Sequence, residues 1–379
     1  MSGLRKFRLQ IVRGRVSVKF VVLFLICAVV AYNEVISFFV SSWRWPKLSS
    51  AYEDDLRVLF VADPQLVGLR YEPPLLGIIN RWDADKYLQF GFFYAVSYVR
   101  PDVVVFLGDL LDEGSIASDD EYMSYIHRFY HVFRMPPAVS SIFISGDNDV
   151  GGEGFDAKLQ HKVDRFSKHF EDSKTGNYTM GVSSIKHIDF QKISVDYGEQ
   201  ILHSKIEMFS DMRAHCKARF RIMCNHMPLL NRLPFEVSKI IDILQPHLII
   251  TAHTHLFQLY RCTDCRPWES APNVKKVQSA RSAKTVDLQN IPRPLSVNLS
   301  DVSQLYELVI PTCSYRMGVS HMGYAAAVIS KNGQMKFDIL WLPSRYRQLA
   351  LYVIILLLVA IRFFLSCLIG YYKILISLN

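Results

Sequence analysis

The feature that most constrains this chain of 379 residues is a pair of long apolar segments, one near each end. Residues 20–40 are mostly apolar, with an interruption at Asn33 and Glu34, and residues 349–371 are mostly apolar apart from Arg362. Each segment is long enough to cross a bilayer once as a helix. A signal peptide is the alternative for the first and a core helix for the second. We predict two transmembrane helices.

The charge distribution predicts their orientation. The net charge is +8, and six cations at positions 5, 6, 8, 13, 15 and 19 precede the first acidic residue. Positive residues beside a membrane helix favour the cytoplasm. We therefore expect residues 1–19 and 372–379 to be cytoplasmic tails and residues 41–348 to be a luminal domain. Because the charge is concentrated at one end, it is not the spread basic face of a nucleic-acid-binding protein, and we expect no nucleic-acid partner.

Sequons and cysteines agree with a luminal domain. Asn177 and Asn298 each begin an N-glycosylation sequon, which predicts a glycoprotein. Cys27 and Cys367 lie in the predicted membrane helices, and five cysteines lie between them. For the pair Cys262-x-x-Cys265, a structural disulfide is favoured over half a zinc site or a redox pair.

Between the two segments, apolar runs typical of buried strands alternate with helical periodicity. Strands are expected at residues 58–62, 103–107, 141–145, 190–195, 220–224 and 248–252, and helices at 83–99, 121–133 and 236–244. Residues 323–341 predict a hairpin that turns at Asn332 and Gly333. Residues 263–304 are polar and contain prolines, so we interpret them as an insertion loop. The alternation predicts one α/β domain.

Polar side chains follow five of these apolar runs. In chain order they are Asp63 and Gln65; Asp109 and Asp112; Asp147, Asn148 and Asp149; Asn225 and His226; and His253 and His255. Taken singly, each has a simpler interpretation as a turn, a helix cap or a core histidine. However, open α/β sheets place their ligands at the carboxyl ends of strands. Five such groups of oxygen and imidazole ligands in order predict a metal site.

This ordered set resembles the calcineurin-like metallophosphoesterase superfamily, whose blocks are D-x-H, G-D-x-x-D, G-N-H-D/E, a lone His and G-H-x-H. The resemblance covers roughly residues 56–260. The block from Asp63 to Gln65 and the flanking membrane helices are similar to the metallophosphoesterase 1 family and its fungal relatives. Residues 311–316, with His321, are similar to that family's final loop on the substrate side. The resemblance implies a four-layer α/β/β/α sandwich that binds two divalent metal ions, commonly manganese.

The resemblance also implies a ligand for each ion. Asp63 and His255 would bind the first metal, Asp109 would bridge both, and the second would be bound by Asp147, His226 and His253. Gln65 stands where most of the superfamily has a histidine ligand, and its amide oxygen would coordinate more weakly. Two such ions lower the pKa of a shared water, which attacks phosphorus in line with the leaving alkoxide.

Position 148 departs from the pattern. Asn148 stands where the superfamily has the histidine that protonates the leaving group, with the Asp112 position orienting it. An amide is not a general acid at neutral pH, and loss of general acid catalysis costs about 10²- to 10⁴-fold in rate. Our hypothesis is that Asn148 orients the phosphoryl group while His321 or a metal-bound water supplies the proton.

The resemblance implies a phosphodiesterase that removes ethanolamine phosphate from a mannose of GPI anchors and supports transport of GPI-anchored proteins from the endoplasmic reticulum to the Golgi. The expected partners are a GPI-anchored glycolipid or protein, membrane lipid and the export machinery. The expected location is the membrane of the endoplasmic reticulum, the intermediate compartment and the cis-Golgi. The alternatives are a catalytically weak, metal-containing protein that binds phosphorylated GPI cargo, and, less favoured, a protein phosphatase.

Overall fold

The computed structural model describes residues 18–49, 52–170, 180–195, 203–231, 235–263, 265, 282–290, 292–301 and 303–378. The chain forms two compact units. One consists of Met1–Ser41 and Pro343–Asn379, and the other is Ser42–Leu342. The luminal domain predicted over residues 41–348 stays a prediction.

Two mixed sheets build the second unit. In the described residues, the first sheet has the order β10-β13-β12-β1-β2-β3 and the second the order β4-β5-β6-β7-β11-β8-β9. The strands are β1 (Leu56–Val61), β2 (Val103–Phe106), β3 (Ser140–Phe143), β4 (Gly181–Ile185), β5 (Ile188–Lys192), β6 (Phe220–Cys224), β7 (Leu248–Thr251), β8 (Gln258–Thr263), β9 (Ser282–Thr285), β10 (Leu295–Asn298), β11 (Gln304–Val309), β12 (Gly323–Ile329) and β13 (Gln334–Trp341). Apolar side chains of both sheets, such as Phe60 and Ile222, share one buried core.

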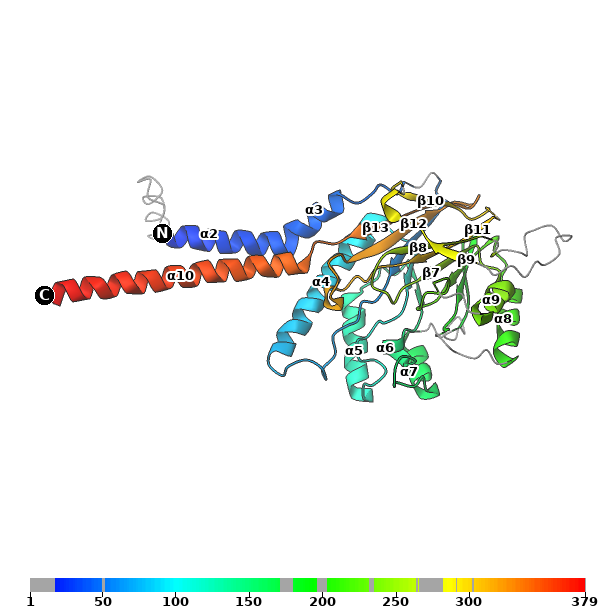
Figure 1. The fold of residues 1–379 in the computed structure, drawn as a ribbon, viewed down its shortest axis with the longest axis horizontal. Coiled ribbons are helices and arrows are strands. Elements are labelled where there is room, and N and C mark those ends of the chain that lie inside the picture. The colour runs from blue at the N-terminus through cyan, green and yellow to red at the C-terminus, as the bar shows by residue number, and fades with distance from the viewer. Residues whose placement is uncertain are drawn as a thin grey trace. The chain divides into compact units, whose positions relative to one another are not determined.

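Helices cover the outer faces of the sheets, as predicted for a four-layer α/β/β/α sandwich (Figure 1). On the first sheet lie α4 (Leu76–Val99) and α5 (Asp119–Val132), and on the second α8 (His203–His215) and α9 (Phe235–Leu244). The short α6 (Asp147–Val150) and α7 (Gln160–Phe170) follow β3. The mixed α/β fold is therefore confirmed.

The ends of the second unit are fastened to each other. Trp45 Nε1 donates a hydrogen bond to the carbonyl of Trp341 (2.8 Å), where β13 ends. The hydroxyl of Tyr98 donates to the carbonyl of Trp45 (3.2 Å), and the two rings meet edge to face. The chain thus enters and leaves this unit at the C-terminal end of α4.

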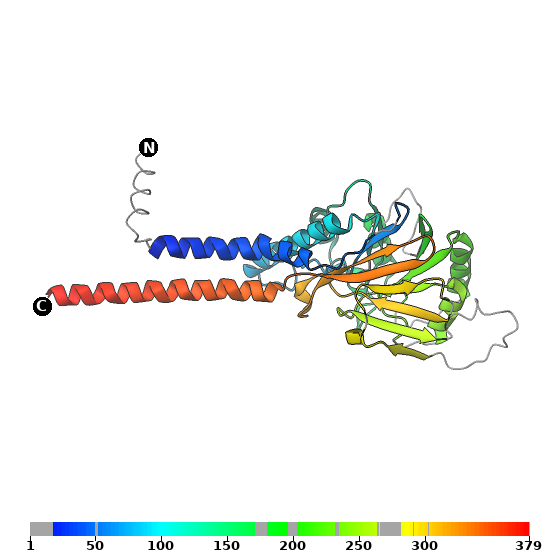
Figure 2. The ribbon, with the colours of Figure 1, turned by 90° about the horizontal axis from the view of Figure 1, so that it is seen from above.

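The first unit is a pair of apolar helices that run beside each other (Figure 2). One combines α2 (Val18–Ala31), a π-helical turn (Tyr32–Ile36) and α3 (Ser37–Trp43), and the other is α10 (Arg345–Leu378). By length and composition, Phe20–Trp43 and Arg345–Tyr371 could each cross a membrane, in agreement with the predicted helices at 20–40 and 349–371. The tail residues 1–17 lie outside the described residues.

A polar cluster joins these two helices at the π-helical turn. Glu34 forms an ion pair with Arg345 (3.0 Å) and accepts a hydrogen bond from the hydroxyl of Tyr352 (2.7 Å). Asn33 Nδ2 donates to the carbonyl of Gln348 (2.8 Å). Charges within membrane helices are costly unless paired. The sequence did not identify Arg345 as the partner of Glu34, because Arg345 precedes the predicted second helix.

The structure corrects some boundaries. Helix α4 begins at Leu76 rather than at the predicted Asp83. The interpretation of residues 263–304 as an insertion loop is wrong in part, because β9 pairs with β8 and β10 pairs with β13. Each of these edge strands has four residues, too few for a clear alternating pattern. A disulfide joins Cys262 to Cys265, a pairing that the sequence alone does not give.

The sequons give no test of glycosylation. Asn298 is exposed at the end of β10, where a glycan could be attached. Asn177 lies outside the described residues.

Candidate metal centre

The predicted ligands meet where the strands of both sheets end. Asp63 follows β1, Asp109 follows β2, and Asp147 begins α6 after β3. His226 follows β6 and His253 follows β7. The ligand atoms of Asp63, Asp109 and His226 lie within 4.8 Å of one another, as do those of Asp147, His226 and His253. We call these five residues the metal cluster.

His226 lies at the centre of the metal cluster. Its Nε2 is 3.1 Å from Asp147 Oδ1 and 3.4 Å from Asp109 Oδ1. Its Nδ1 donates a hydrogen bond to the carbonyl of Leu107 (2.8 Å), which fixes the tautomer and leaves Nε2 as the ligand atom. His253 Nδ1 lies 3.2 Å from both Asp147 Oδ1 and His226 Nε2. Four ligand atoms therefore face one another: Nε2 of His226, Nδ1 of His253, and Oδ1 of Asp109 and of Asp147.

Buried oxygens without donors indicate what the metal cluster holds. Both carboxylate oxygens of Asp63, and Oδ1 of Asp147, are buried without a hydrogen-bond partner. A buried carboxylate without a donor or counter-charge is strongly unfavourable. Divalent cations supply that charge, and carboxylate oxygens with imidazole nitrogens are suitable ligands for them. The residues present therefore fit the divalent metal ions that the sequence predicts, while manganese in particular stays a prediction.

Gln65 and His255 lie beside the metal cluster. Gln65 Nε2 donates to Asp109 Oδ2 (2.9 Å) and lies 3.4 Å from His255 Nε2. The amide nitrogen, rather than the oxygen, thus faces Asp109, and coordination through the oxygen would require the amide to turn over. The predicted roles of Gln65 and His255 as ligands stay predictions.

Asn148 holds Asp109 rather than pointing to Asp112. Its backbone N–H donates to Asp109 Oδ1 (3.0 Å) and its Nδ2 donates to Oδ2 (2.9 Å). Asp112 is half-buried, and burial raises its pKa to about 6 against the opposing charge of Arg316. The expectation that Asp112 orients position 148 therefore differs from the hydrogen bonds that the structure shows.

His321 is exposed, and its contacts lie away from the metal cluster. Its Nδ1 is 2.7 Å from Ser320 Oγ, and its ring meets Trp341 edge to face. Neither partner is a ligand or a neighbour of a ligand. The role of His321 as proton donor stays a prediction.

Several site residues have a left-handed backbone conformation. Asp63, Gln65, Asp109, His253 and His255 all have φ between 38° and 69°. This left-handed region is rarely adopted by residues other than glycine, and it persists only where the surroundings enforce it. Five of the predicted site residues thus have a conformation that is unfavourable for the chain and specific to the site.

Two glycines provide the space that the metal cluster needs. A Cβ on Gly146 would lie 2.2 Å from Asp109 Oδ1, and a Cβ on Gly108 would lie 2.5 Å from His226 Nδ1. Gly108 and Gly146 each stand between an apolar run and a predicted ligand, but the sequence analysis gave them no role. Their role is to let two strand ends approach each other closely.

Two buried acids hold the ligand loops: Asp149, which the sequence analysis placed in a polar group without a role of its own, and Glu307, which it missed. Asp149 accepts hydrogen bonds from the backbone N–H groups of Gly146, Leu110 and Leu111 (2.9 to 3.2 Å). Glu307 in β11 accepts from the N–H groups of residues 229 and 230, both at 2.7 Å. An acid inside an apolar strand was the signal for Glu307. These bonds fix the loops that carry Asp109, Asp147 and His226.

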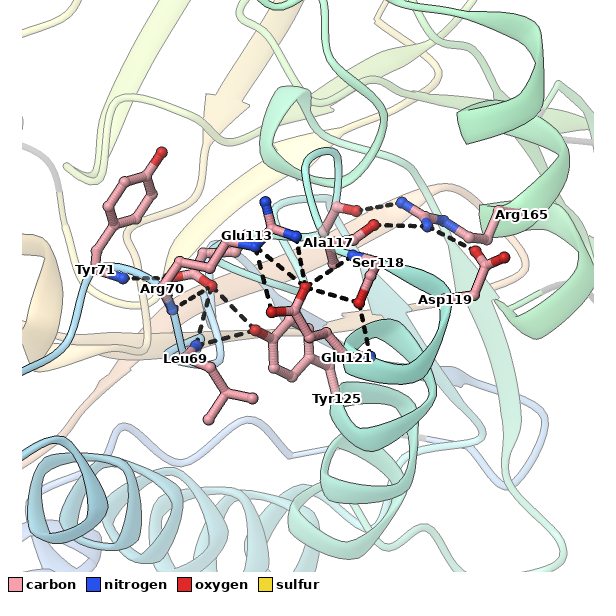
Figure 3. A network of polar contacts seen from close by, with 11 residues as sticks. Leu69, Arg70, Tyr71, Glu113, Ala117, Ser118, Asp119, Glu121, Tyr125 and Arg165 are labelled. Atoms are coloured by element: carbon pink, nitrogen blue, oxygen red, sulfur yellow. Dashed lines mark hydrogen bonds and ion pairs between the residues drawn. The ribbon is translucent and has the colours of Figure 1, made fainter. Parts of the chain in front are cut away.

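Glu113 fixes the loop that follows Gln65 (Figure 3). Its buried carboxylate accepts hydrogen bonds from the backbone N–H groups of residues 69–71 and from the hydroxyl of Tyr125, all at 3.0 Å. Arg70 in this loop also pairs with Glu121 (2.7 Å) on α5. The loop is therefore tied to the first turns of α5.

Burial and mutual charge control the protonation of the metal cluster. Burial raises the pKa of Asp63 to about 8. Burial alone would lower the pKa of His226, but the charges of Asp109, Asp147 and Asp63 outweigh it and raise that pKa well above its usual value. Burial and the neighbouring His253 lower the pKa of His255 to about 4. Without a cation, the carboxylates are thus compensated by protons.

Comparison with known proteins gives consistent matches. The model of the calcineurin-like phosphoesterase family matches residues 56–257. The chain is 32% identical over 173 residues to "Metallophosphoesterase 1 homolog" of Drosophila melanogaster, covering 45% of this chain and 44% of that protein. It is 29% identical over 291 residues to "Metallophosphoesterase 1" of Xenopus laevis, covering 61% of this chain and 69% of that protein.

A solved structure is also similar to this chain. The purple acid phosphatase PPD1 of yellow lupin matches with a TM-score of 0.45 and 12% identity, over 78% of this chain and 52% of that chain. The chain spans less than half of the Drosophila relative's length and about two thirds of the Xenopus relative's.

We expect Gly146→Ala to reduce metal binding. The added Cβ meets Asp109 Oδ1, so this carboxylate must shift away from the other ligands. Metal analysis of the purified full chain after dialysis against Mn²⁺ should show at least a twofold lower content. Gly370→Ala is the matched control, because its Cβ has nothing within 4 Å and its φ is not in the left-handed region. Equal metal content in both variants would contradict the role of Gly146.

We also expect metal affinity to increase with pH. Because the pKa of Asp63 is about 8, its carboxyl is protonated at pH 7 in the metal-free chain, and a cation must displace that proton. Affinity should therefore rise between pH 6 and 8, by up to about tenfold per pH unit for one proton. Titration calorimetry with Mn²⁺ in buffers of different ionisation enthalpy counts the released protons. Binding without proton release at pH 7 would be inconsistent with a protonated Asp63.

Proposed function

The chain belongs to the calcineurin-like phosphoesterase family of metal-dependent phosphoester hydrolases, and we propose that it is a membrane-anchored phosphodiesterase acting on a lipid-linked phosphoester. The metal cluster carries this proposal. Asp63, Asp109, Asp147, His226 and His253 come from five separate segments, and their ligand atoms converge around the two buried oxygens of Asp63, which have no hydrogen-bond partner. Two divalent cations, which we propose to be Mn²⁺, would be held by these residues together with His255.

The chain's own residues prepare the site for hydrolysis. When bound, two divalent cations lower the pKa of a water and neutralise charge on the phosphoryl oxygens. The carbonyl of Leu107 accepts from Nδ1 and so keeps Nε2 of His226 facing Asp109 and Asp147. Asn148 holds both oxygens of Asp109 through two hydrogen bonds, so it orients this carboxylate and has no proton to give. The leaving alkoxide must take its proton from another group, and His321 stays our candidate.

We further propose ethanolamine phosphate on a mannose of GPI anchors as the substrate. The similarity to relatives named metallophosphoesterase 1 and the resemblance of the block from Asp63 to Gln65 support this substrate. Two apolar helices would hold the site beside a bilayer, where a glycolipid is concentrated. The proposal includes a luminal domain, residence in the endoplasmic reticulum and early Golgi, and a role with the export machinery for GPI-anchored proteins.

The test begins with the purified full chain in detergent. With Mn²⁺ it should hydrolyse bis(p-nitrophenyl) phosphate, and Asp109→Asn or His226→Ala should lower kcat/KM at least about 100-fold, because each removes a ligand of the catalytic ions. His161→Ala, an exposed histidine on α7, is the control and should stay within twofold. Absence of hydrolysis with every divalent metal would reject a phosphodiesterase. Mass spectrometry of GPI glycans from cells lacking the protein should show retained ethanolamine phosphate.

Asn148 favours one second candidate, a metal-containing protein that binds phosphorylated GPI cargo without rapid turnover. Asn148→His separates the two candidates. In a binding protein, the restored imidazole should raise hydrolysis of a soluble phosphodiester at least about 100-fold, the lower end of the range for general acid catalysis. In an enzyme adapted to Asn148, the same change should leave the rate equal or lower, because it removes the hydrogen bond from Asn148 Nδ2 to Asp109 Oδ2, while the backbone N–H still donates to Oδ1. Steady-state kinetics of both proteins at equal metal content decides between them.

A further inference from the structure

Helix α4 is apolar on two opposite faces. Its inner face packs on the first sheet through buried residues such as Leu88 and Phe92. On the opposite side, Leu75, Ile78, Ile79, Trp82 and Phe93 have exposed fractions of 60% to 84%. At 100° per residue Leu75, Ile79, Trp82 and Phe93 lie about 120° to 180° from Leu88, with Ile78 about 80° from it at the edge of this face, and we call these five side chains the outer stripe. A surface helix normally carries polar residues there, and a helix apolar all round is buried or in lipid.

The polar residues of α4 do not cover this outer stripe. Asp85 is paired with Arg128 (2.7 Å), and Asp83 accepts a hydrogen bond from the hydroxyl of Tyr315 (2.8 Å). Asn80 donates to Glu72 (2.6 Å). These polar groups are therefore engaged by the rest of the second unit. These three polar side chains of the helix thus bond to the protein, while the large apolar side chains of the outer stripe face solvent.

We propose that the outer stripe of α4 is a lipid-binding surface that lies in the headgroup region of a bilayer and brings the metal cluster to that surface. Lipid is the occupant that the composition favours, because helices lying in a membrane interface combine large apolar side chains and Trp with flanking cations. Here Lys86 Nζ lies over the Trp82 ring, 4.9 Å from its centre, so the outer stripe carries a cation beside its tryptophan.

The connection to α10 supports a bilayer as the occupant. Strand β13 ends at Trp341 and α10 begins at Arg345. Three residues span at most about 11 Å, so a bilayer crossed by α10 lies within a short chain length of the second unit. The chain leaves this unit beside Tyr98, at the C-terminal end of the same helix that carries the outer stripe.

Helix α4 is also connected to the metal cluster. The ring of Tyr315 meets Tyr87 of α4 edge to face (5.3 Å between centroids). Three residues earlier, the hydroxyl of Thr312 donates to the carbonyl of Asp63 (2.7 Å). One short loop thus contacts both α4 and a ligand. The inference rests on the proposed function only in taking the substrate to be linked to lipid.

The first test measures depth in the membrane and needs no activity. The full chain is placed in nanodiscs of phosphatidylcholine with or without bromine on the acyl chains, and the fluorescence of Trp82 is obtained as the difference between wild type and Trp82→Phe. Bromine should quench this component at least about twofold, since interfacial helices bury their apolar face about 5 to 10 Å deep. Equal Trp82 fluorescence in both lipids would overturn the proposal.

The second test uses the double variant Ile78→Ser with Ile79→Ser. Hydrolysis of a phosphodiester carried by a lipid in the same nanodiscs should fall at least fivefold, while hydrolysis of bis(p-nitrophenyl) phosphate stays within twofold. Leu159→Ser is the control, since this leucine is exposed elsewhere. Equal rates for the double variant and wild type on both substrates would overturn the proposal. Inactivity of the wild type on both substrates would reject the proposed function and leave the quenching result to decide the lipid surface.

A second copy of the chain is the competing occupant of the outer stripe. If two copies pair through it, Trp82 stays unquenched by bromine, and the double variant lowers the mass measured by light scattering in detergent. That combination would replace the lipid surface by a dimer interface.

Discussion

Burial of negative charge at the strand ends is the constraint on which the rest of the structure depends. Asp63 is fully buried, and neither of its carboxylate oxygens receives a hydrogen bond. Asp109 receives two from Asn148, and Asp147 shares two histidines. Only protons or cations can balance such a group of acids. The sandwich therefore holds together a site that is unfavourable by itself and becomes favourable with its ions.

The surrounding fold enforces this arrangement through backbone groups more than through side chains. Left-handed φ values at Asp63, Asp109 and His253 are costly, and residues with such values usually lie at functional sites. Three bonds from backbone N–H groups to Asp149 and two to Glu307 fix the neighbouring loops. Removing an acceptor of this kind would leave several buried donors unsatisfied. The positions of the ligand side chains thus depend on two acids outside the metal cluster, Asp149 and Glu307.

The sequence predicted what depends on local pattern. Runs such as residues 220–224 are apolar and bounded, so the strand lies where expected, and the polar groups after such runs come together because parallel strands end at one edge. What could not be predicted depends on distant contacts. Edge strands such as β9 exist through their pairing with β8. The side chain of Asn148 donates to Asp109 and does not contact Asp112. The first turns of α4, from Leu76, carry exposed apolar residues, and sequence periodicity does not distinguish these from residues of the core.

The hydrogen bond between Trp45 and the carbonyl of Trp341 has a mechanical consequence. Because this hydrogen bond joins the two ends of the second unit, a force applied to either apolar helix acts on that bond first and does not separate a strand from its sheet. Proteolytic cleavage of the two short connecting segments would release the sandwich with the hydrogen bond between Trp45 and Trp341 intact. With its two apolar helices in a bilayer, as we propose, the sandwich would keep its own integrity.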